Sequence, residues 1–140
     1  MISVDGYLNF PGNALEAFEF YRSVFGGELE QHLRYRDFGG DSGFDSADAD
    51  RTAHVSLRLT PSFALMGSDV PERAEPSFVV GTNHYLHLNM GSAREAEQVF
   101  EALSRGGQVE SPLSKTAWAD LYGSLTDRFG VRWMINFTSE

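Results

Sequence analysis

Histidine is the residue type of this chain best suited to acid–base or metal chemistry, and the four histidines are His32, His54, His84 and His87. The imidazole group titrates near neutral pH and binds transition metals, so two histidines that meet could form a weak metal site or a general base. His54 and His87 are the better candidates, because each lies in a stretch where polar and apolar residues alternate as on a half-buried strand. A lone histidine in such a place is more often a hydrogen-bonding group. We interpret His32 as an ordinary surface or partly buried residue and His84 as a structural residue.

Most other catalytic chemistries leave no trace in the sequence. The absence of cysteine excludes disulfides, thiolate zinc sites and a cysteine nucleophile. No glycine-rich phosphate loop and no Gly-x-Ser-x-Gly elbow is present. The Asp-rich stretch 37–52 does not have the residue order of a calcium loop, and we interpret it as a loop that could act as a lid.

The charge balance argues against polyanionic partners. The chain has 20 acidic and 11 basic residues among 140, a net charge of −9, whereas binding of phosphate backbones requires clustered Lys and Arg. No apolar stretch approaches the ~20 residues that span a bilayer, and the first residues do not resemble a signal peptide. We therefore expect a cytoplasmic protein that binds neither nucleic acid nor membrane, although an acidic surface could attract a cationic ligand.

An internal repeat positions the candidate histidines. Residues 13–17 and 92–96 each begin a helical pattern, about 80 residues apart. Each pattern follows a Leu-Asn strand end and runs to a double glycine, at 26–27 and at 106–107. A duplicated unit predicts two modules that pair about a pseudo-twofold axis and leave a cleft between them. We expect function in that cleft.

Each half has one helical pattern followed by several extended segments, which favours a mixed, mainly antiparallel sheet with its helix on one face. The sequence therefore predicts an α+β fold of two paired βαβββ modules that form a curled mixed sheet. We expect a single domain, 1–140, with module one at 1–69, a linker at 70–82 and module two at 83–140. The expected helices begin at N-caps Asn13 and Ser92, the latter in a capping box with Glu95. The expected strands are 6–10, 28–36, 53–60 and 63–68 in the first half, then 84–90, 108–110, 118–126 and 131–137 in the second.

Several stretches carry a family resemblance. They are 7–10 with 16–21, 53–58, 118–123 and, most specific of all, 126–136, which reads Thr-Asp-Arg-Phe-Gly-Val-Arg-Trp-Met-Ile-Asn. They resemble the vicinal oxygen chelate superfamily, which includes glyoxalase I, extradiol dioxygenases and bleomycin-resistance proteins, and within it the PhnB-like branch. The resemblance implies that each module curls into a half-barrel with its helix on the convex side and a ligand in the concave cup. It also implies a homodimer with two cups.

Strand alternation within the implied half-barrels selects the residues that face the cup. The polar members could orient a ligand or cap local backbone, and the aromatic members could stack a planar ligand or pack in the core and a dimer interface. The candidate ligand-binding residues are Tyr7, Asn9, His54, Met66, His87, Trp118, Tyr122, Met134 and Asn136.

The resemblance also bears on metal binding. Metal-using members bind Fe, Mn, Ni or Zn through His or Gln together with Glu on the first and last strands of each module. Met134 stands where the usual closing glutamate falls, and Met66 lies at or near the matching place in the first module. Because thioether sulfur is a poor ligand for hard divalent ions, we expect no metal and no other cofactor. The alternative is a divalent metal held by His54 and His87 with unconventional partners.

The sequence thus predicts a PhnB-like small-molecule-binding protein that lacks the family metal site, with the ligand in a cup between the modules. A metal-dependent lyase, isomerase or dioxygenase of the superfamily is the alternative, and a purely structural dimer is a third hypothesis. Relatives of this branch are sometimes described as methyltransferase-like, but no nucleotide-cofactor motif follows a strand here. The sequence assigns no catalytic residue and no specific ligand.

Overall fold

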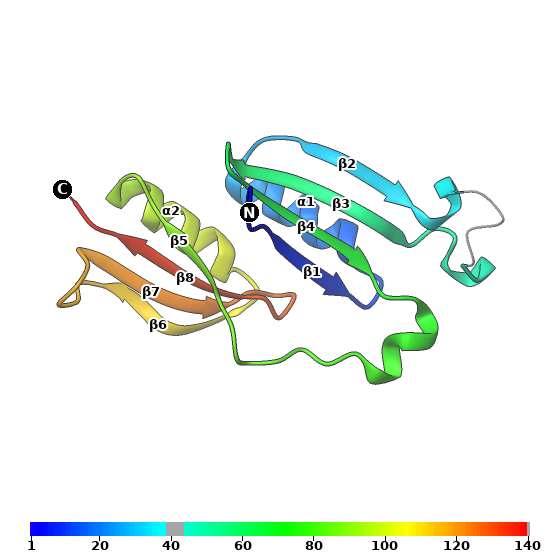
Figure 1. Ribbon diagram of the computed structural model, residues 1–140. Coiled ribbons are helices and arrows are strands. Elements are labelled where there is room, and N and C mark those ends of the chain that lie inside the picture. The colour runs from blue at the N-terminus through cyan, green and yellow to red at the C-terminus, as the bar shows by residue number, and fades with distance from the viewer. Residues whose placement is uncertain (39–43, 140) are drawn as a thin grey trace. The chain divides into compact units, whose positions relative to one another are not determined.

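The computed structural model describes residues 1–38 and 44–139, and the chain forms two compact units, Met1–Val79 and Val80–Glu140 (Figure 1). Each unit contains one α-helix and one four-stranded sheet. The element order within each unit is βαβββ, which confirms the α+β fold of two modules that the repeat predicts.

Unit 1 consists of β1 (Gly6–Phe10), α1 (Ala14–Phe25), β2 (Leu29–Arg34), β3 (Thr52–Thr60) and β4 (Phe63–Asp69). The strand order is β1-β4-β3-β2, with β1 parallel to β4 and the other neighbours antiparallel. Short 3₁₀ helices lie in the connections, namely η1 (Tyr35–Phe38), η2 (Ser46–Asp48) and η3 (Glu72–Ser77). The expected loop 37–52 therefore includes η2 and the end of η1, and its residues 39–43 lie outside the described part of the chain.

Unit 2 repeats this topology with β5 (Leu86–Asn89), α2 (Ala93–Ser104), β6 (Gln108–Ser114), β7 (Leu121–Thr126) and β8 (Arg132–Phe137) in the order β5-β8-β7-β6. Strand β6 continues four residues beyond the expected 108–110. It contains Pro112 and two register shifts, which an edge strand tolerates because one side of its backbone is unpaired. Strand β7 begins at Leu121, so Trp118 precedes the strand that was expected to include it.

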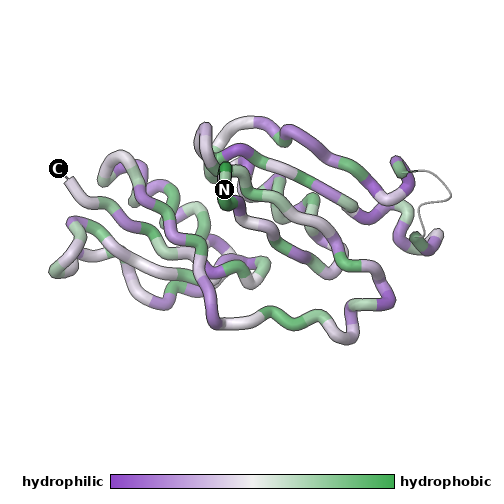
Figure 2. Tube along the Cα trace, viewed as in Figure 1, coloured by the Kyte–Doolittle hydropathy of each residue, from purple (hydrophilic) through white to green (hydrophobic). Residues whose placement is uncertain are grey.

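The core of each unit lies between its helix and its sheet. Helix α1 packs on β3 and β4, and α2 packs on the strands β6, β7 and β8 (Figure 1). Hydrophilic and hydrophobic residues alternate along the strands (Figure 2), as expected when one face of a sheet is buried. The largest fully buried side chains are Phe10, Phe18, Tyr21, Val55, Leu57 and Leu65 in unit 1, and Leu103, Leu125, Trp133 and Ile135 in unit 2.

Glycine at position 67 permits close packing of α1 on the sheet of unit 1. A Cβ atom at Gly67 would lie 2.7 Å from the carbonyl oxygen of Leu8 and 2.9 Å from Cε1 of Phe18. Because real Cβ atoms do not approach other atoms this closely, only glycine allows the Phe18 ring to rest against the middle of the sheet.

The two helices are capped in different ways. Ser92 accepts a hydrogen bond from the amide of Glu95 at 3.1 Å, so the expected N-cap of α2 is confirmed, although the Glu95 carboxylate accepts from Gly91 rather than from Ser92 itself. Asn13 does occupy the N-cap position of α1, as expected, but its side chain makes no capping hydrogen bond. Asp69, which is only 3% exposed, instead accepts from the amides of Gly12 and Ala14 at the start of α1.

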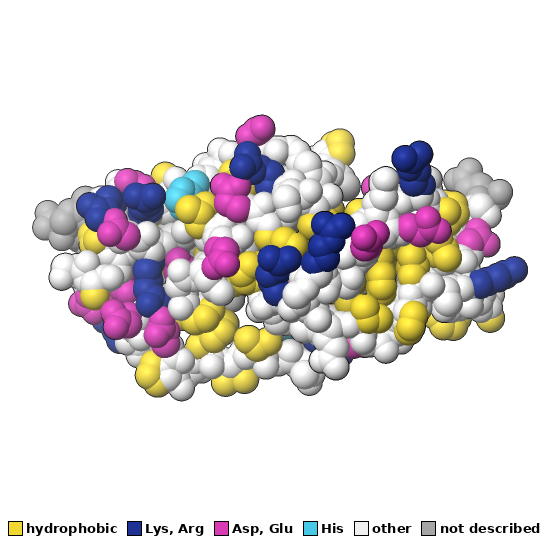
Figure 3. Space-filling model, turned by 180° about the vertical axis from the view of Figure 1, so that it is seen from behind, with side chains coloured by type: hydrophobic (Ala, Val, Ile, Leu, Met, Phe, Trp, Pro, Cys, Tyr) yellow, Lys and Arg dark blue, Asp and Glu magenta, His cyan; other side chains and the backbone are white. Residues whose placement is uncertain are grey.

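The surface shows no concentration of one charge on the face seen in Figure 3. Acidic and basic side chains are interspersed there, with apolar side chains visible between them. Helices α1 and α2 have 12 residues each, and among the described residues no helix has the length and apolar character needed to cross a membrane.

Candidate functional site

The face of each sheet opposite its helix, called the open face below, carries most of the candidate residues. In unit 1, one row of register partners runs across the four strands of the open face. Tyr7 of β1 pairs with Met66 of β4, Met66 pairs with Ser56 of β3, and Ser56 pairs with Gln31 of β2. Tyr7 is 48% exposed, whereas Ser56 is buried. The row is therefore exposed to solvent at β1 and buried at β3.

His54 lies on the same open face and contacts Tyr7. The Tyr7 hydroxyl is 3.3 Å from Nδ1 of His54, and the two ring centroids are 5.7 Å apart. Asn9 follows two residues after Tyr7 and accepts a hydrogen bond from the Ser68 hydroxyl at 3.4 Å. The structure thus brings Tyr7, His54 and Met66 together and places Asn9 beside its register partner Ser68.

The open face of unit 2 carries two corresponding rows. His87 of β5 pairs with Met134 of β8, which pairs with Ser124 of β7. The second row lies two residues away along each strand and consists of Asn89, Asn136 and Tyr122. The Asn136 amide donates to Oδ1 of Asn89 at 3.0 Å, so one carbonyl oxygen and one amide group of this pair remain unbonded within the described residues.

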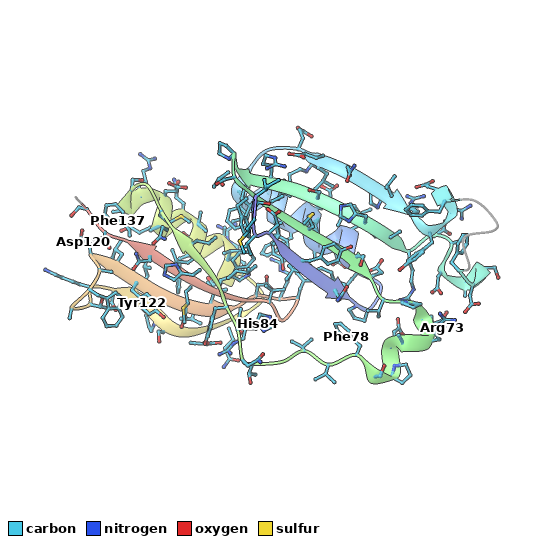
Figure 4. All side chains as sticks on the ribbon, viewed as in Figure 1. Arg73, Phe78, His84, Asp120, Tyr122 and Phe137 are labelled. Atoms are coloured by element: carbon cyan, nitrogen blue, oxygen red, sulfur yellow. The ribbon has the colours of Figure 1, made fainter. Side chains whose placement is uncertain are left out.

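Trp118 and Tyr122 form an aromatic pair where β7 begins, and Tyr122 is labelled in Figure 4. Their ring centroids are 5.5 Å apart with the planes inclined by 67°, an edge-to-face arrangement. Trp118 is 66% exposed although it is a large apolar side chain. It is held by the turn that starts at Thr116, whose hydroxyl accepts from the amides of Trp118 and Ala119.

A polar cluster on the open face of unit 2 was not among the candidate residues. The Arg132 guanidinium lies 4.0 Å from the centroid of the Tyr85 ring and 3.2 Å from the Glu110 carboxylate. Glu110 also accepts from the hydroxyls of Tyr85 at 2.6 Å and Thr126 at 2.7 Å. These hydrogen bonds, of which the one from Tyr85 has the largest effect, lower the pKa of Glu110 below its ordinary value. The hydrogen bond between Tyr85 and Glu110 also raises the pKa of Tyr85.

Glu110, on the edge strand β6, was not among the candidate residues. The register of β6 against β7 shifts between Val109 and Ser111, so Glu110 occupies a bulge. Val109 pairs with the buried Leu125, so alternation from Val109 puts Glu110 on the open face, where its carboxylate contacts Arg132 and Thr126. Arg132 pairs in register with Thr126, whose hydroxyl donates to Glu110, so the three side chains meet on neighbouring strands.

The remaining two histidines have local partners. Nε2 of His32 is 3.1 Å from the hydroxyl of Thr52, and Nδ1 of His84 is 3.2 Å from Oδ1 of Asn83. Neither is a register neighbour of His54 or His87 on an open face.

The residues present do not fit the metal site of the superfamily. Met66 pairs with Tyr7 in unit 1, and Met134 pairs with His87 in unit 2, so each of these neighbours carries a thioether. Asp5, just before β1, is engaged with the amide of Ala64 at 2.8 Å. Among residues 1–38 and 44–139, no three or more His, Asp or Glu side chains are grouped so that they could hold a metal ion. A hard divalent ion would lack carboxylate ligands here.

The most specific sequence motif, 126–136, forms the turn between β7 and β8 and most of β8. The Asp127 carboxylate accepts from the amides of Phe129 and Val131 and, at 2.9 Å, from the indole nitrogen of the fully buried Trp133. Gly130 has a φ of 86°, a left-handed conformation that favours glycine. The aspartate, glycine and tryptophan of this motif are therefore structural.

Comparisons with known proteins agree with the fold. The family model of the Glyoxalase/Bleomycin resistance protein/Dioxygenase superfamily matches residues 7–135 of this chain. Protein YjdN of Escherichia coli is 29% identical over 143 residues, covering 96% of this chain and 94% of its own. The crystal structure of protein PA1353 from Pseudomonas aeruginosa is 39% identical with a TM-score of 0.83 and full coverage of both chains.

Two further structures show a likeness of fold alone. A Bacillus cereus protein described as a putative 3-demethylubiquinone-9 3-methyltransferase, PhnB protein, is 24% identical with a TM-score of 0.78, covering 96% of this chain and 98% of its own. The fosfomycin resistance protein FosX from Listeria monocytogenes is 10% identical with a TM-score of 0.66, covering 99% and 96%. Both contain the same arrangement of strands and helices with little sequence in common.

Proposed function

Since the chain belongs to the Glyoxalase/Bleomycin resistance protein/Dioxygenase superfamily, we propose that it is a PhnB-like protein that binds a small organic molecule on its open faces without the superfamily's metal. The observation that carries the proposal is the pair of methionines, Met66 beside Tyr7 and Met134 beside His87. The family resemblance implies that Met134 stands where metal-using members have a closing glutamate, and that Met66 lies at or near the matching place in the first module. Such a surface favours the carbon skeleton of a ligand over a cation.

Within unit 1, the proposed contacts are the Tyr7–His54 pair for a polar group of the ligand and Met66 for its apolar part. The Tyr7 hydroxyl is hydrogen-bonded to Nδ1 of His54, and within the described residues Nε2 has no hydrogen-bond partner, so a ligand could bind it. Asn9 would add a further amide donor. Polar groups of this kind orient a ligand, while apolar contact supplies most of the affinity.

Within unit 2, the proposed contacts are the aromatic pair of Trp118 and Tyr122 together with His87, Met134 and Asn136. The exposed Trp118 ring offers a flat surface for a planar ligand. The amide pair of Asn89 and Asn136 retains one acceptor and one donor. These features support a ligand with a ring and at least one hydrogen-bonding group.

Two measurements test the proposal. Metal analysis of the purified protein should find less than one-tenth of an equivalent of transition metal. A thermal-shift screen should find an organic compound that raises the unfolding midpoint, since a ligand at 100 times its Kd stabilises the folded state by about 2.7 kcal/mol. The shift should be lost in His54→Ala for a ligand bound to unit 1, or in Trp118→Ala for a ligand bound to unit 2. It should be kept in His84→Gln, a matched control whose side chain is hydrogen-bonded to Asn83.

The alternative function is a metal-dependent lyase, isomerase or dioxygenase that uses His54 and His87. A near-stoichiometric metal that disappears in both His54→Ala and His87→Ala but not in His84→Gln would establish the alternative and refute the metal-free proposal. The methyltransferase description belongs to the Bacillus cereus protein. It is not proposed for this chain, whose sequence has no nucleotide-cofactor motif.

We also propose a homodimer as the working form. Exposed apolar side chains, Val79 at 81% and Val80 at 56%, are of the kind that association covers. Light scattering coupled to size exclusion should give twice the 15.6 kDa mass of one chain. A single-chain mass at micromolar concentration would refute the dimer.

A further inference from the structure

A hollow lies in unit 1, away from the open face. It has a volume of about 380 Å³, at the small end of the ~300–1,000 Å³ usual for ligand pockets. Ala53 of β3 lines it, and Ala53 alternates with His54, so the hollow is not part of the surface that carries His54. The lining residues are Tyr35, Phe38, Phe44, Asp45, Asp48, Ala53, Pro71 and Arg73.

Hydrogen bonds between distant segments hold the walls of this hollow in place. The Tyr35 hydroxyl donates to the carbonyl oxygen of Asp69 at 3.0 Å, and the Tyr35 amide donates to that of Arg51 at 3.1 Å. The Arg51 guanidinium in turn donates to the carbonyl oxygen of Val70 at 2.9 Å and to Glu75 at 2.5 Å. The segment leading into η3 is therefore tied to β3, and the hollow is formed before any ligand arrives.

Three aromatic side chains form the apolar part of the wall. The rings of Tyr35 and Phe44 are 6.2 Å apart with their planes inclined by 44°. Phe38 is 55% exposed, which is unfavourable for a phenyl ring in the absence of a partner. The pKa of Tyr35 is raised mainly by burial and, to a smaller extent, by the nearby carboxylates of Asp48 and Asp69, as expected for a partly buried site. The wall is suited to a flat ring.

The charged side chains of the lining divide into one that is engaged and two that are available. Asp48 is 2% exposed, accepts from the amide of Glu72 at 2.9 Å and lies 3.5 Å from Nε of Arg51. Asp45 and Arg73 are exposed, and within the described residues neither side chain has an ion pair or hydrogen bond. Arg73 projects from η3 (Figure 4), and Asp45 lies at the start of η2. One free negative and one free positive charge thus border the same aromatic hollow.

We propose that this hollow binds a small aromatic zwitterion, meaning a flat ring that carries one cationic and one anionic group, as in an aromatic amino acid. The ring contacts Tyr35, Phe38 and Phe44. The cationic group pairs with Asp45, and the anionic group pairs with Arg73, whose guanidinium matches a carboxylate in two parallel hydrogen bonds. This site is independent of the ligand proposed for the open faces.

The test uses the full-length protein and three indole compounds that differ in the charged groups they carry. L-Tryptophan has both charges, tryptamine lacks the carboxylate, and indole-3-propionate lacks the amine. Isothermal titration should show that L-tryptophan binds roughly tenfold more tightly than either of the others, because each charged hydrogen bond contributes on this order. Equal binding of all three, or no binding at millimolar concentration, would overturn the proposal.

Three variants assign the contacts. Arg73→Gln should abolish the preference for L-tryptophan over tryptamine, and Asp45→Asn should abolish the preference over indole-3-propionate. Phe38→Ser should weaken all three compounds by a similar factor. Arg94→Gln, an exposed change on α2 in the other unit, is the matched control and should leave all three affinities unchanged. Wild-type affinities in Arg73→Gln and Asp45→Asn would contradict the assigned charge contacts, whatever happens to the open-face ligand.

Discussion

Replacing Asp69 should destabilise unit 1 more than any change to an exposed carboxylate of this chain. Asp69 is 3% exposed and accepts three backbone hydrogen bonds, from Gly12 at 3.1 Å, Ala14 at 2.9 Å and Thr52 at 2.9 Å. Two of these cap α1 and the third fixes the start of β3. Asp69→Ala removes the acceptor from all three amides at once.

The size of the effect follows from the number of amides left without a partner. A hydrogen bond to a charged acceptor contributes about 1.5–3 kcal/mol, and bonds to one carboxylate are coupled rather than additive. We expect Asp69→Ala to lower the free energy of unfolding by about 3–5 kcal/mol. Asp69→Asn keeps one oxygen for Gly12 and Ala14 and turns an amide group toward Thr52, so its cost should be about 1.5–3 kcal/mol.

Urea denaturation followed by far-ultraviolet circular dichroism measures these changes. Tryptophan fluorescence serves as a second probe, because both tryptophans, Trp118 and Trp133, lie in unit 2. If the units unfold together, both probes give the same lowered midpoint; if not, the dichroism changes first. Glu72→Ala, an exposed carboxylate on η3, is the control and should change stability by less than about 0.5 kcal/mol. The reasoning is refuted if Asp69→Ala and Glu72→Ala unfold at the same urea concentration.

The other predictions concern packing, capping and pH. Gly67→Ala should cost about 1–3 kcal/mol by thermal denaturation, because the added methyl group clashes with Leu8 and Phe18; an unchanged midpoint would contradict the close approach of α1. Ser92→Ala should cost about 1 kcal/mol through loss of the α2 cap, and Ser92→Asp should restore it. The pKa of Glu110 is lower in the folded protein than in the unfolded chain, so its contribution to stability is present above its ordinary value of 4.5 and is lost as the pH falls through the folded value. The fall in stability between pH 5 and pH 3 should therefore be smaller in Glu110→Gln, and equal slopes in variant and wild type would argue against the cluster.

Local patterns determined much of the architecture. The repeat of a Leu-Asn strand end, a capped helix and a double glycine predicted two βαβββ modules, since each of these signals acts within a few residues. Alternation along the strands put Tyr7 and His54 on one face of the sheet of unit 1, and His87 and Met134 on one face of the sheet of unit 2. The β7–β8 hairpin is equally local, because Asp127 bonds to Phe129 and Val131 in its own turn.

The features that sequence reasoning missed all depend on contacts between distant residues. The cap of α1 comes from Asp69, 55 residues after Ala14, so Asn13 looked like the cap although its own side chain is not used. Glu110 of β6 joins Arg132 of β8 across β7, and the two residues are 22 positions apart in the sequence. The aromatic hollow is built from η1, η2, β3 and the approach to η3, which no single stretch of sequence brings together. Local propensities and alternation decided which elements form, but only tertiary packing decided which polar groups from separate elements satisfy one another, because a buried amide or carboxylate bonds to whatever partner the fold places within reach.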